Sequence, residues 1–182
     1  MATVVLGITG SISAYKACEL TRLLIKAGHE VLVTMTPHAT EFVTPLTFQT
    51  LSKNPVEVEL FGREGIWMPS HISLAQRADV FVIAPCTANV IGKVAHGIAD
   101  DLLTSTAIAT KAPTLIAPAM NVDMWNNVAN QANVKLLMER GVKIIDAETG
   151  ELACGTTGKG RMADPAKIVE VIEATLAEIK KA

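Results

Sequence analysis

The sequence has 182 residues, of which 49% are hydrophobic and 19% are charged, and its formal net charge at pH 7 is -2. This apolar content excludes a disordered chain and is enough for the core of one compact domain. Because no basic stripe is present and only 4% of the residues are aromatic, the sequence also argues against a nucleic-acid-binding protein.

The cysteines and the N-terminus bear on the cellular compartment. Cys18, Cys86 and Cys154 form no CxxC pair and are odd in number, which disfavours a disulfide scaffold and favours a reducing cytoplasm. The first residues, MATVVLGITGS, lack a basic segment and a cleavage signature, so we predict a strand rather than a signal peptide. No uncharged apolar run reaches the roughly 18 residues of a membrane helix. We therefore expect a cytoplasmic protein that does not enter a membrane.

Short runs rich in β-branched residues alternate with longer stretches of helical periodicity. The predicted strands are, in chain order, residues 4–9, 30–35, 80–84, 114–117 and 143–145. The first helix is predicted over 13–27, and the last begins at Asp164, an N-cap followed by proline. The run VFVIA is apolar throughout, as expected for a parallel strand buried on both faces. This alternation predicts an α/β fold: a single Rossmann-like domain over 1–182 with a doubly wound parallel sheet.

The first strand leads into GITGSIS at the start of a helix. Backbone N–H groups at a helix start, together with the hydroxyls of Ser11 and Ser13, suit a phosphate. The motif is not G-x-G-x-x-G, and the second strand ends in Thr34 and Thr36 rather than in the acidic residue that binds ribose in NAD enzymes. A mononucleotide phosphate is the preferred interpretation. The alternative is a tight turn at Gly10 with a serine that only caps the helix.

Two later strands end in polar motifs, which should lie at the same edge of the sheet. In PCTAN, Thr87 and Asn89 offer a hydroxyl and an amide to a flat polar ring, while Pro85 holds the backbone. Helix capping by Thr87 explains this motif equally well. In PAMNVDMW, the amide of Asn121 can bind a carboxylate without adding charge, and Met124 supplies an apolar wall. An Asn-capped helix with a core Met and Trp is the simpler explanation there.

Two further segments carry groups that could move protons. His71 has no second histidine at metal-ligand spacing, so no metal site is expected. Its imidazole is a candidate base near neutral pH, although a lone histidine is more often structural. The segment ELACGTTGKGRMAD places Cys154 beside Gly155 and near Arg161, which predicts a mobile lid with a thiol and a cation. A flexible surface loop with an incidental cysteine is the alternative.

Together, these segments resemble the homo-oligomeric flavin-containing Cys decarboxylases. GITGSISAYK, HISLAQRADVFVIAPCTANVIGKVA, PAMNVDMW and ACGTTGKGRM cover essentially the whole chain in the family's order. PAMNVDMW fits the family's PxMNxxMW, whereas PCTANV departs from PASANT at Cys86 and Val90 and keeps a hydroxyl at Thr87. The resemblance implies FMN as cofactor, bound at a subunit interface of a trimer that can assemble further into a dodecamer. It implies 4'-phospho-N-pantothenoylcysteine as substrate.

The resemblance also implies a reaction and residue roles. The substrate thiol is oxidised to a thioaldehyde, carbon dioxide is lost, and the enethiol is reduced to 4'-phosphopantetheine. His71 is implied as the base, Asn121 as the ligand of the carboxylate, and Cys154 as the proton donor. The implied FMN ligands are Gly10, Ser11, Ser13, Thr36, Pro85, Thr87 and Asn89. The implied substrate contacts are Asn121, Met124, Ala153, Cys154, Gly155 and Arg161.

Three alternatives with the same fold stay open. A peptidyl-cysteine decarboxylase shares His71 and the Asn motif but need not carry the ACG segment. A flavin prenyltransferase lacks PAMNVDMW, and an FMN-binding regulator of a phosphatase typically lacks a catalytic residue or carries acidic extensions. In many bacteria a CTP-dependent ligase domain follows this one. We therefore expect a stand-alone decarboxylase or an excised domain, with a phosphopantothenate–cysteine ligase as a partner.

Overall fold

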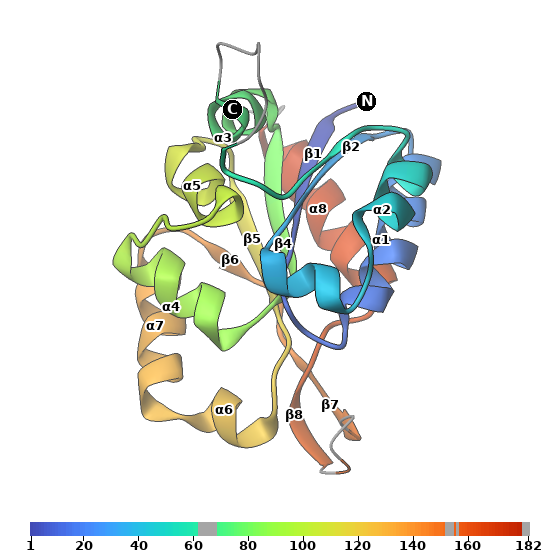
Figure 1. Ribbon diagram of the computed structural model, residues 1–182. Helices are drawn as coiled ribbons and strands as arrows, with labels where there is room; N and C mark the ends of the chain where they lie inside the picture. The colour runs from blue at the N-terminus through green and yellow to red at the C-terminus, as the bar shows by residue number, and fades with distance from the viewer. Residues whose placement is uncertain (62–68, 152–154, 156, 180–182) are drawn as a thin grey trace.

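The fold is built on a parallel sheet of six strands, and a two-stranded hairpin follows the sheet in the chain (Figure 1). The computed structural model describes residues 1–61, 69–151, 155 and 157–179. The strands of the sheet are β1 (Thr3–Ile8), β2 (Glu30–Met35), β3 (Val56–Glu57), β4 (Val80–Cys86), β5 (Thr114–Pro118) and β6 (Lys143–Ile144). The antiparallel hairpin consists of β7 (Glu148–Glu151) and β8 (Thr157–Arg161).

The order of the strands across the sheet is β3-β2-β1-β4-β5-β6, and every pair is parallel. The chain begins in the middle with β1, moves outward to β3, and then returns to β4 on the other side of β1. The direction of winding therefore reverses between β1 and β4. In doubly wound sheets, ligands bind beyond the carboxyl ends of the strands at this point.

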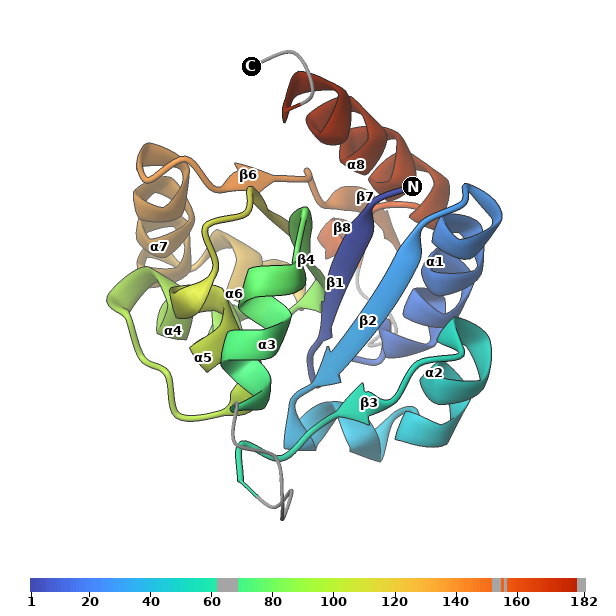
Figure 2. The same cartoon turned by 90° about the horizontal axis from the view of Figure 1, so that it is seen from above.

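Helices cover both faces of the sheet (Figure 2). They are α1 (Ala14–Lys26), the 3-10 helix η1 (Pro37–Glu41), α2 (Pro45–Ser52), α3 (Ser70–Arg77), α4 (Ala88–His96), α5 (Leu102–Ala109), α6 (Val122–Asn126), α7 (Val128–Glu139) and α8 (Pro165–Ile179). Figure 2 shows α1, α2 and α8 on one side of β1 and β2, and α3, α4, α5 and α7 on the other. The predicted doubly wound α/β fold is therefore confirmed.

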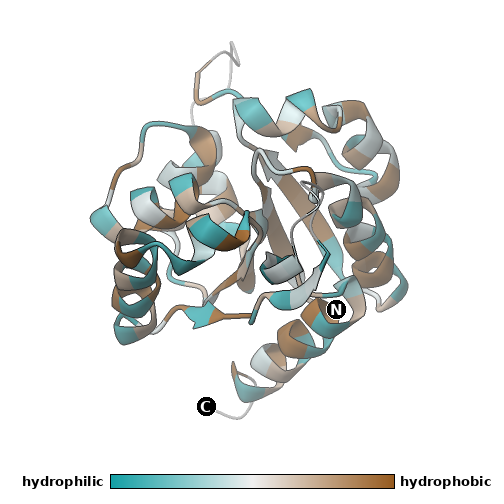
Figure 3. Ribbon diagram, turned by 90° about the horizontal axis from the view of Figure 1, so that it is seen from below, coloured by the Kyte–Doolittle hydropathy of each residue, from teal (hydrophilic) through white to brown (hydrophobic). Residues whose placement is uncertain are grey.

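The sheet separates two apolar cores. Alternate residues of β1 point to opposite faces, so Leu6 packs in the cluster with Leu20 of α1 and Ile168 of α8, whereas Val5 packs with Leu103 of α5. All seven residues of β4 are buried, as expected for a central parallel strand. Figure 3 shows that the strands in the centre are mostly hydrophobic, while hydrophilic residues gather on the helices. None of the described helices is long and apolar enough to cross a bilayer.

The five predicted strands are all present, with ends that differ by at most two residues. The sequence did not reveal β3, which has two residues and pairs only with Val33 and Thr34 of β2. It also did not reveal the β7–β8 hairpin, whose glycine-rich strands lack the alternating β-branched residues that signal a strand. The segment predicted as a loop, residues 151–164, therefore contains the second strand of an antiparallel hairpin and the last residue of the first.

Candidate active site

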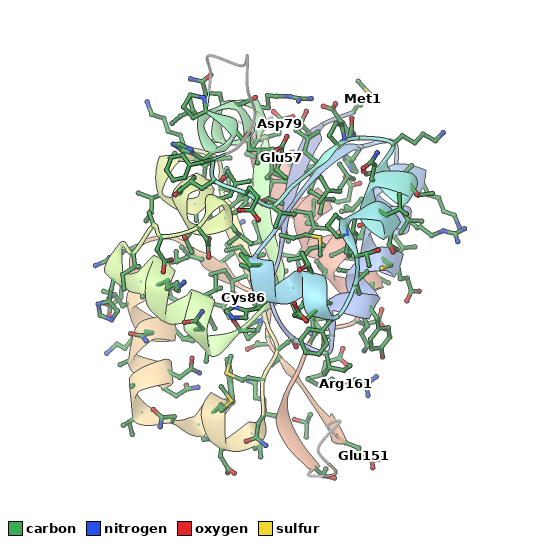
Figure 4. The ribbon with its side chains drawn as sticks, in the orientation of Figure 1. Met1, Glu57, Asp79, Cys86, Glu151 and Arg161 are labelled. Carbon is green, nitrogen blue, oxygen red and sulfur yellow. The ribbon has the colours of Figure 1, made fainter. Side chains whose placement is uncertain are left out.

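A pocket of about 770 Å³ opens at the carboxyl ends of β1, β4 and β5. Its lining comes from the β1–α1 turn, the start of α4, the β5–α6 connection and the β7–β8 hairpin. Figure 4 shows Cys86 at the end of β4 and Arg161 and Glu151 on the hairpin, all in the same half of the molecule. The volume lies within the roughly 300–1,000 Å³ of small-molecule sites. Four separate sequence motifs thus converge on one cavity.

The β1–α1 turn fits closely against η1. A Cβ atom at Gly10 would come within 2.7 Å of His38 Cβ, so the turn requires glycine at this position. Ser13 occupies the N-cap position of α1 but makes no side-chain capping bond, and its N–H donates to Ser11 Oγ at 3.3 Å. Ser13 therefore does not cap α1 with its side chain, while Ser11 accepts a backbone N–H at the start of the helix. The Ser13 side chain lines the pocket together with Ser11, at the positive end of a 13-residue helix.

Thr36 carries a buried hydroxyl beside this turn. Its N–H donates to Ile8 O at 3.0 Å, which holds the residue against the end of β1. The side chain is 4% exposed, yet Oγ1 has no hydrogen-bond partner among the described residues. A buried hydroxyl without a partner is unfavourable, so a ligand group is the expected partner. Thr36 is not part of the pocket lining, but its hydroxyl lies beside the turn, and the two together fit the phosphate end of FMN.

A buried hydrogen-bond network joins the ends of β1 and β4. Thr9 Oγ1 donates to Pro85 O at 2.7 Å and accepts from the Thr87 N–H at 3.0 Å. The Thr87 side chain accepts from the Val90 N–H at 3.4 Å, so the capping explanation is correct, although Thr87 also lines the pocket. Pro85 is buried within β4 and Asn89 is exposed on α4, and neither belongs to the lining. This structure therefore does not bring Pro85 and Asn89 into the pocket.

Asn121 lies between β5 and α6 and lines the pocket. Its Oδ1 accepts from the Asp123 N–H at 2.8 Å, so Asn121 is the N-cap of α6, as the simpler explanation predicted. That bond engages the amide oxygen, and Nδ2 is the hydrogen-bond donor of the side chain. Trp125 is buried, but Met124 is 49% exposed and lines the pocket. Trp125 and Met120 pack in the core cluster, as the simpler explanation expects, whereas Met124 faces the pocket.

The hairpin packs directly on this β5–α6 connection. The Met120 N–H donates to Gly160 O at 2.9 Å. A Cβ atom at Gly160, where φ is +151°, would lie 2.3 Å from Met120 O. A Cβ at Gly158 would lie 2.5 Å from a methyl carbon of Val122. The glycines of β8 are therefore explained by close packing, and the hairpin holds its position against the segment that carries Asn121.

Only part of the predicted cysteine-bearing segment can be described. Gly155 and Arg161 line the pocket, and their roles as substrate contacts stay predictions. Ala153 and Cys154 lie outside the described residues. Their proposed roles stay predictions.

Comparison with known proteins identifies the family. The family model described as Flavoprotein matches residues 1–177. The chain belongs to the flavoprotein family. Two curated relatives are the coenzyme A biosynthesis bifunctional protein CoaBC of Bacillus subtilis, 48% identical over 175 residues, and a probable phosphopantothenoylcysteine decarboxylase of Streptococcus mutans, 43% identical over 175 residues. The alignments cover 96% of this chain and 43% of the Bacillus protein, and 95% of this chain and 98% of the Streptococcus protein. The chain thus spans less than half of the bifunctional relative.

Solved structures agree with this assignment. A cysteine-to-serine mutant of PPC decarboxylase, complexed with pantothenoylaminoethenethiol, superposes with a TM-score of 0.84 and 32% identity, over 95% of this chain and 97% of that one. The FMN binding protein AtHal3 gives a TM-score of 0.80 and 32% identity, over 95% of both chains. The described part of this flavoprotein therefore shares its architecture with both.

His71 lies outside the pocket of its own chain. It is the second residue of α3, it is half-buried, and its Nδ1 is buried without a hydrogen-bond partner among the described residues. It is not part of the lining, and Figure 1 shows α3 at the opposite end of the molecule from β7–β8. One copy of the chain therefore does not bring His71 together with Asn121. The described residues also contain no cluster of three metal-binding side chains.

Cys86 is the last residue of β4 and carries a thiol near the carboxyl end of the sheet. It is fully buried, and burial raises the pKa of its thiol far above the usual range. Its Sγ–H donates to Thr87 O at 3.8 Å. Because this thiol stays protonated at ordinary pH and faces no solvent, Cys86 is a packing residue rather than an acid or nucleophile.

Proposed function

We propose that residues 1–182 form one FMN-dependent decarboxylase domain that converts 4'-phospho-N-pantothenoylcysteine to 4'-phosphopantetheine in coenzyme A biosynthesis. The observation that carries the proposal is that Ser11 and Ser13 line one pocket with Asn121 and the β7–β8 hairpin. The residues proposed for the cofactor phosphate and those proposed for the substrate carboxylate thus line the same pocket, so FMN and substrate can bind next to each other. The activity named for the Streptococcus mutans relative, which aligns over nearly its full length, supports the same reaction.

The residues of this chain fit FMN better than a dinucleotide. Gly10, Ser11 and Ser13 would hold the phosphate, Thr36 would donate its hydroxyl, and Thr87 would lie near the ring. β2 ends without the acidic residue that binds the ribose of NAD. When bound, FMN supplies the two-electron oxidation of the substrate thiol and returns the electrons after decarboxylation. The FMN-binding relative AtHal3, with a TM-score of 0.80, supports this choice of flavin.

Asn121 suits a carboxylate that has to leave as carbon dioxide. A cation would stabilise the carboxylate before the reaction and would thereby raise the barrier to its loss. A neutral amide orients the carboxylate with a weaker hydrogen bond. Met124 and Met120 add apolar surface around the same position and reduce its hydration. We propose that Asn121 aims the carboxylate while the neighbouring apolar side chains favour the loss of charge.

We propose that His71 acts as the base in the pocket of a neighbouring copy within a trimer. Its absence from the pocket of its own chain supports this arrangement. Ile12 and Tyr15 line the pocket with exposures of 53% and 59%, and large exposed apolar side chains at a site are typical of an interface.

Further assembly into a dodecamer and a ligase partner are part of the same proposal, because the Bacillus subtilis relative is bifunctional. A cytoplasmic location fits the odd number of cysteines.

Cys154 is proposed as the proton donor in the last step, when the enethiol is reduced to the product thiol. A thiol with a reference pKa of about 8.5 is a far stronger acid than a serine hydroxyl. Cys154→Ser should therefore release carbon dioxide but form little 4'-phosphopantetheine. Cys18→Ser is the matched control, because Cys18 lies on α1 and does not line the pocket.

The test is an anaerobic reaction of the FMN-loaded protein with 4'-phospho-N-pantothenoylcysteine, in which carbon dioxide and 4'-phosphopantetheine are both quantified. Equal amounts of the two products from the wild type and from Cys18→Ser are expected. No carbon dioxide from the FMN-loaded wild type would contradict the proposed function. Normal 4'-phosphopantetheine formation by Cys154→Ser would contradict the role of Cys154 alone.

A further inference from the structure

We infer that Asn130 of α7 is a positioning residue, which holds Asn121 in place for the substrate carboxylate. This inference rests on the proposed function and deepens it, because it names a group outside the pocket on which the alignment of the carboxylate depends. Asn130 was not expected from the sequence to take part in the site, and it is not among the residues that line the pocket. It acts through two residues of the segment that carries Asn121.

That segment depends on its neighbours for its position. Asn121 is followed by α6, which has only five residues, and a helix of this length is not stable without tertiary contacts. The Trp125 N–H donates to Asn121 O at 2.9 Å, so the position of Asn121 follows that of Trp125. On the other side, Met120 comes directly before Asn121 in the chain. A group that holds both Trp125 and the Met120 side chain therefore limits the movement of Asn121 from both sides.

The Asn130 side chain makes both of these contacts. It is 6% exposed and lies in the first turn of α7, which Figure 1 shows next to α6. Its Nδ2 donates to Trp125 O at 3.2 Å and to Met120 Sδ at 3.5 Å. Because a carbonyl oxygen and a thioether sulfur can only accept, they determine which end of the amide faces them. The two N–H groups of one side chain thus connect α7 to both ends of the segment.

The oxygen of this amide argues against a purely structural role. Asn130 Oδ1 is buried and has no hydrogen-bond partner among the described residues, which is unfavourable for stability. Trp125 O also accepts from Gln131 Nε2 at 2.6 Å, so this carbonyl would keep a partner in Asn130→Leu. The Met120 thioether is a weak acceptor that needs no donor. Asn130→Leu would therefore remove an unpaired polar atom at little cost, and stability alone does not explain asparagine at this position.

The consequence for the reaction lies in the orientation of the carboxylate. Met120 and Asn121 both line the pocket, so a shift of the Met120 side chain or of α6 moves the proposed carboxylate site relative to the turn at Ser11 and Ser13. A misplacement of about 1 Å can lower the rate of a reaction about 100-fold. Asn130 therefore supports kcat through geometry, and it contributes little to KM because it does not touch the ligand.

The test compares Asn130→Leu with Gln131→Leu in the FMN-loaded protein. Gln131 is the matched control, because it is the next residue of α7 and donates to the same Trp125 carbonyl rather than to Met120. Carbon dioxide release from 4'-phospho-N-pantothenoylcysteine gives kcat and KM, and the apoprotein gives the urea midpoint and the affinity for FMN. Asn130→Ser, which is too short to reach both acceptors, is the second variant in case Asn130→Leu does not fold.

A further measurement needs no turnover. Carbon-13 labels on the methionine methyl groups report on Met120 by NMR, and its signal is assigned by its disappearance in Met120→Leu. We expect this signal to shift in Asn130→Leu, because the sulfur loses its donor. It should stay in place in Gln131→Leu.

We expect kcat to fall about 10- to 100-fold in Asn130→Leu and by less in Asn130→Ser, with KM and FMN affinity close to those of the wild type. The urea midpoint of Asn130→Leu should be equal or higher. Unchanged kcat in both Asn130 variants, or an equal loss in Gln131→Leu, would overturn the inference. A lowered urea midpoint together with lost FMN affinity would also overturn it, because Asn130 would then be structural.

The failure of the proposed function has a different signature. No carbon dioxide from the FMN-loaded wild type would contradict that function, whatever the variants do. An unshifted Met120 signal in Asn130→Leu would overturn the inference about Asn130 even if the wild type is fully active.

Discussion

The two ends of the parallel sheet use polar groups in opposite ways. At the amino end, the Thr3 N–H donates to Asp79 Oδ2 at 2.7 Å, Thr3 Oγ1 donates to Glu30 at 3.0 Å, and Arg77 donates to Glu30 at 2.8 Å. At the carboxyl end, the buried Thr36 hydroxyl has no partner among the described residues. The named side chains at the amino end pair with one another, whereas Thr36 Oγ1 is one of the buried polar atoms that the described residues leave without a partner, and it lies beside the pocket. Changes at the two ends should therefore have different consequences.

The largest expected effect is a loss of turnover without a loss of fold. His71→Asn should lower carbon dioxide release about 1,000-fold, because general-base catalysis contributes roughly 100- to 10,000-fold. FMN content and the thermal unfolding midpoint should stay close to those of the wild type, because His71 is half-buried near the start of α3, outside the two apolar cores. His96→Asn is the control, since His96 is an exposed histidine that bonds Asn133 at 2.9 Å. Activity within tenfold of the wild type in His71→Asn would return this residue to a structural role.

The next effect tests whether the hairpin must pack against the β5–α6 connection. Gly160→Ala would place a Cβ atom 2.3 Å from Met120 O at a φ of +151°, so the hairpin has to shift. We expect a loss of about 2 kcal/mol or more in the free energy of unfolding, measured by urea denaturation, together with lower product formation. Gly97→Ala is the matched control: its φ is +70° and nothing lies within 4 Å of the new atom. Its loss should be about 1 kcal/mol and should leave product formation intact. Equal losses in the two variants would show that the close approach at Gly160 is unimportant.

The smallest effect concerns the ion pair between Lys93 of α4 and Asp100, which lies just before α5. The side-chain hydrogen bonds from Lys93 lower the pKa of Asp100. A carboxyl whose folded pKa is lowered stabilises the fold above its unfolded pKa of about 3.9, and this stabilisation is lost as pH falls through the folded pKa. Asp100→Asn should therefore lower the unfolding midpoint slightly at pH 7 but not near pH 2, and less so in high salt. A midpoint difference that stays constant from pH 7 to pH 2 would show that the ion pair is not its cause.

The main strands of the central sheet could be predicted from the sequence, because each is marked by a local run of apolar, β-branched residues. The uniformly apolar run at residues 80–84 predicted a strand buried on both faces, and the structure has β4 there with every residue buried. Strand β3 has no such pattern, because its two residues become a strand only through pairing with β2. Gly158 and Gly160 looked like signs of a loop, since their packing on Val122 and Met120 depends on segments that are distant in the sequence. The parts that could not be predicted are those that depend on tertiary contacts.

The candidate site was predicted in the same uneven way. Ser11, Ser13 and Asn121 were found because they follow strands, and parallel strands end at one edge. Lys16 of the pocket lining was missed, although its position three residues after Ser13 places it one helical turn farther along the same face. The separation of His71 from the pocket could not be predicted, because it depends on how α3 packs against distant parts of the chain.

The most direct test of the contrast between the two ends uses one hydroxyl from the carboxyl end and one carboxylate from the amino end. Thr36→Val removes a buried hydroxyl that has no partner in the described part of the chain, so the apoprotein should unfold at the same or a slightly higher urea concentration, while FMN affinity should fall about tenfold. Asp79→Ala removes the acceptor of the Thr3 N–H, so the apoprotein should lose about 1 kcal/mol of stability, while FMN affinity should stay unchanged. The opposite pattern, a destabilised Thr36→Val apoprotein with full FMN affinity, would contradict the account.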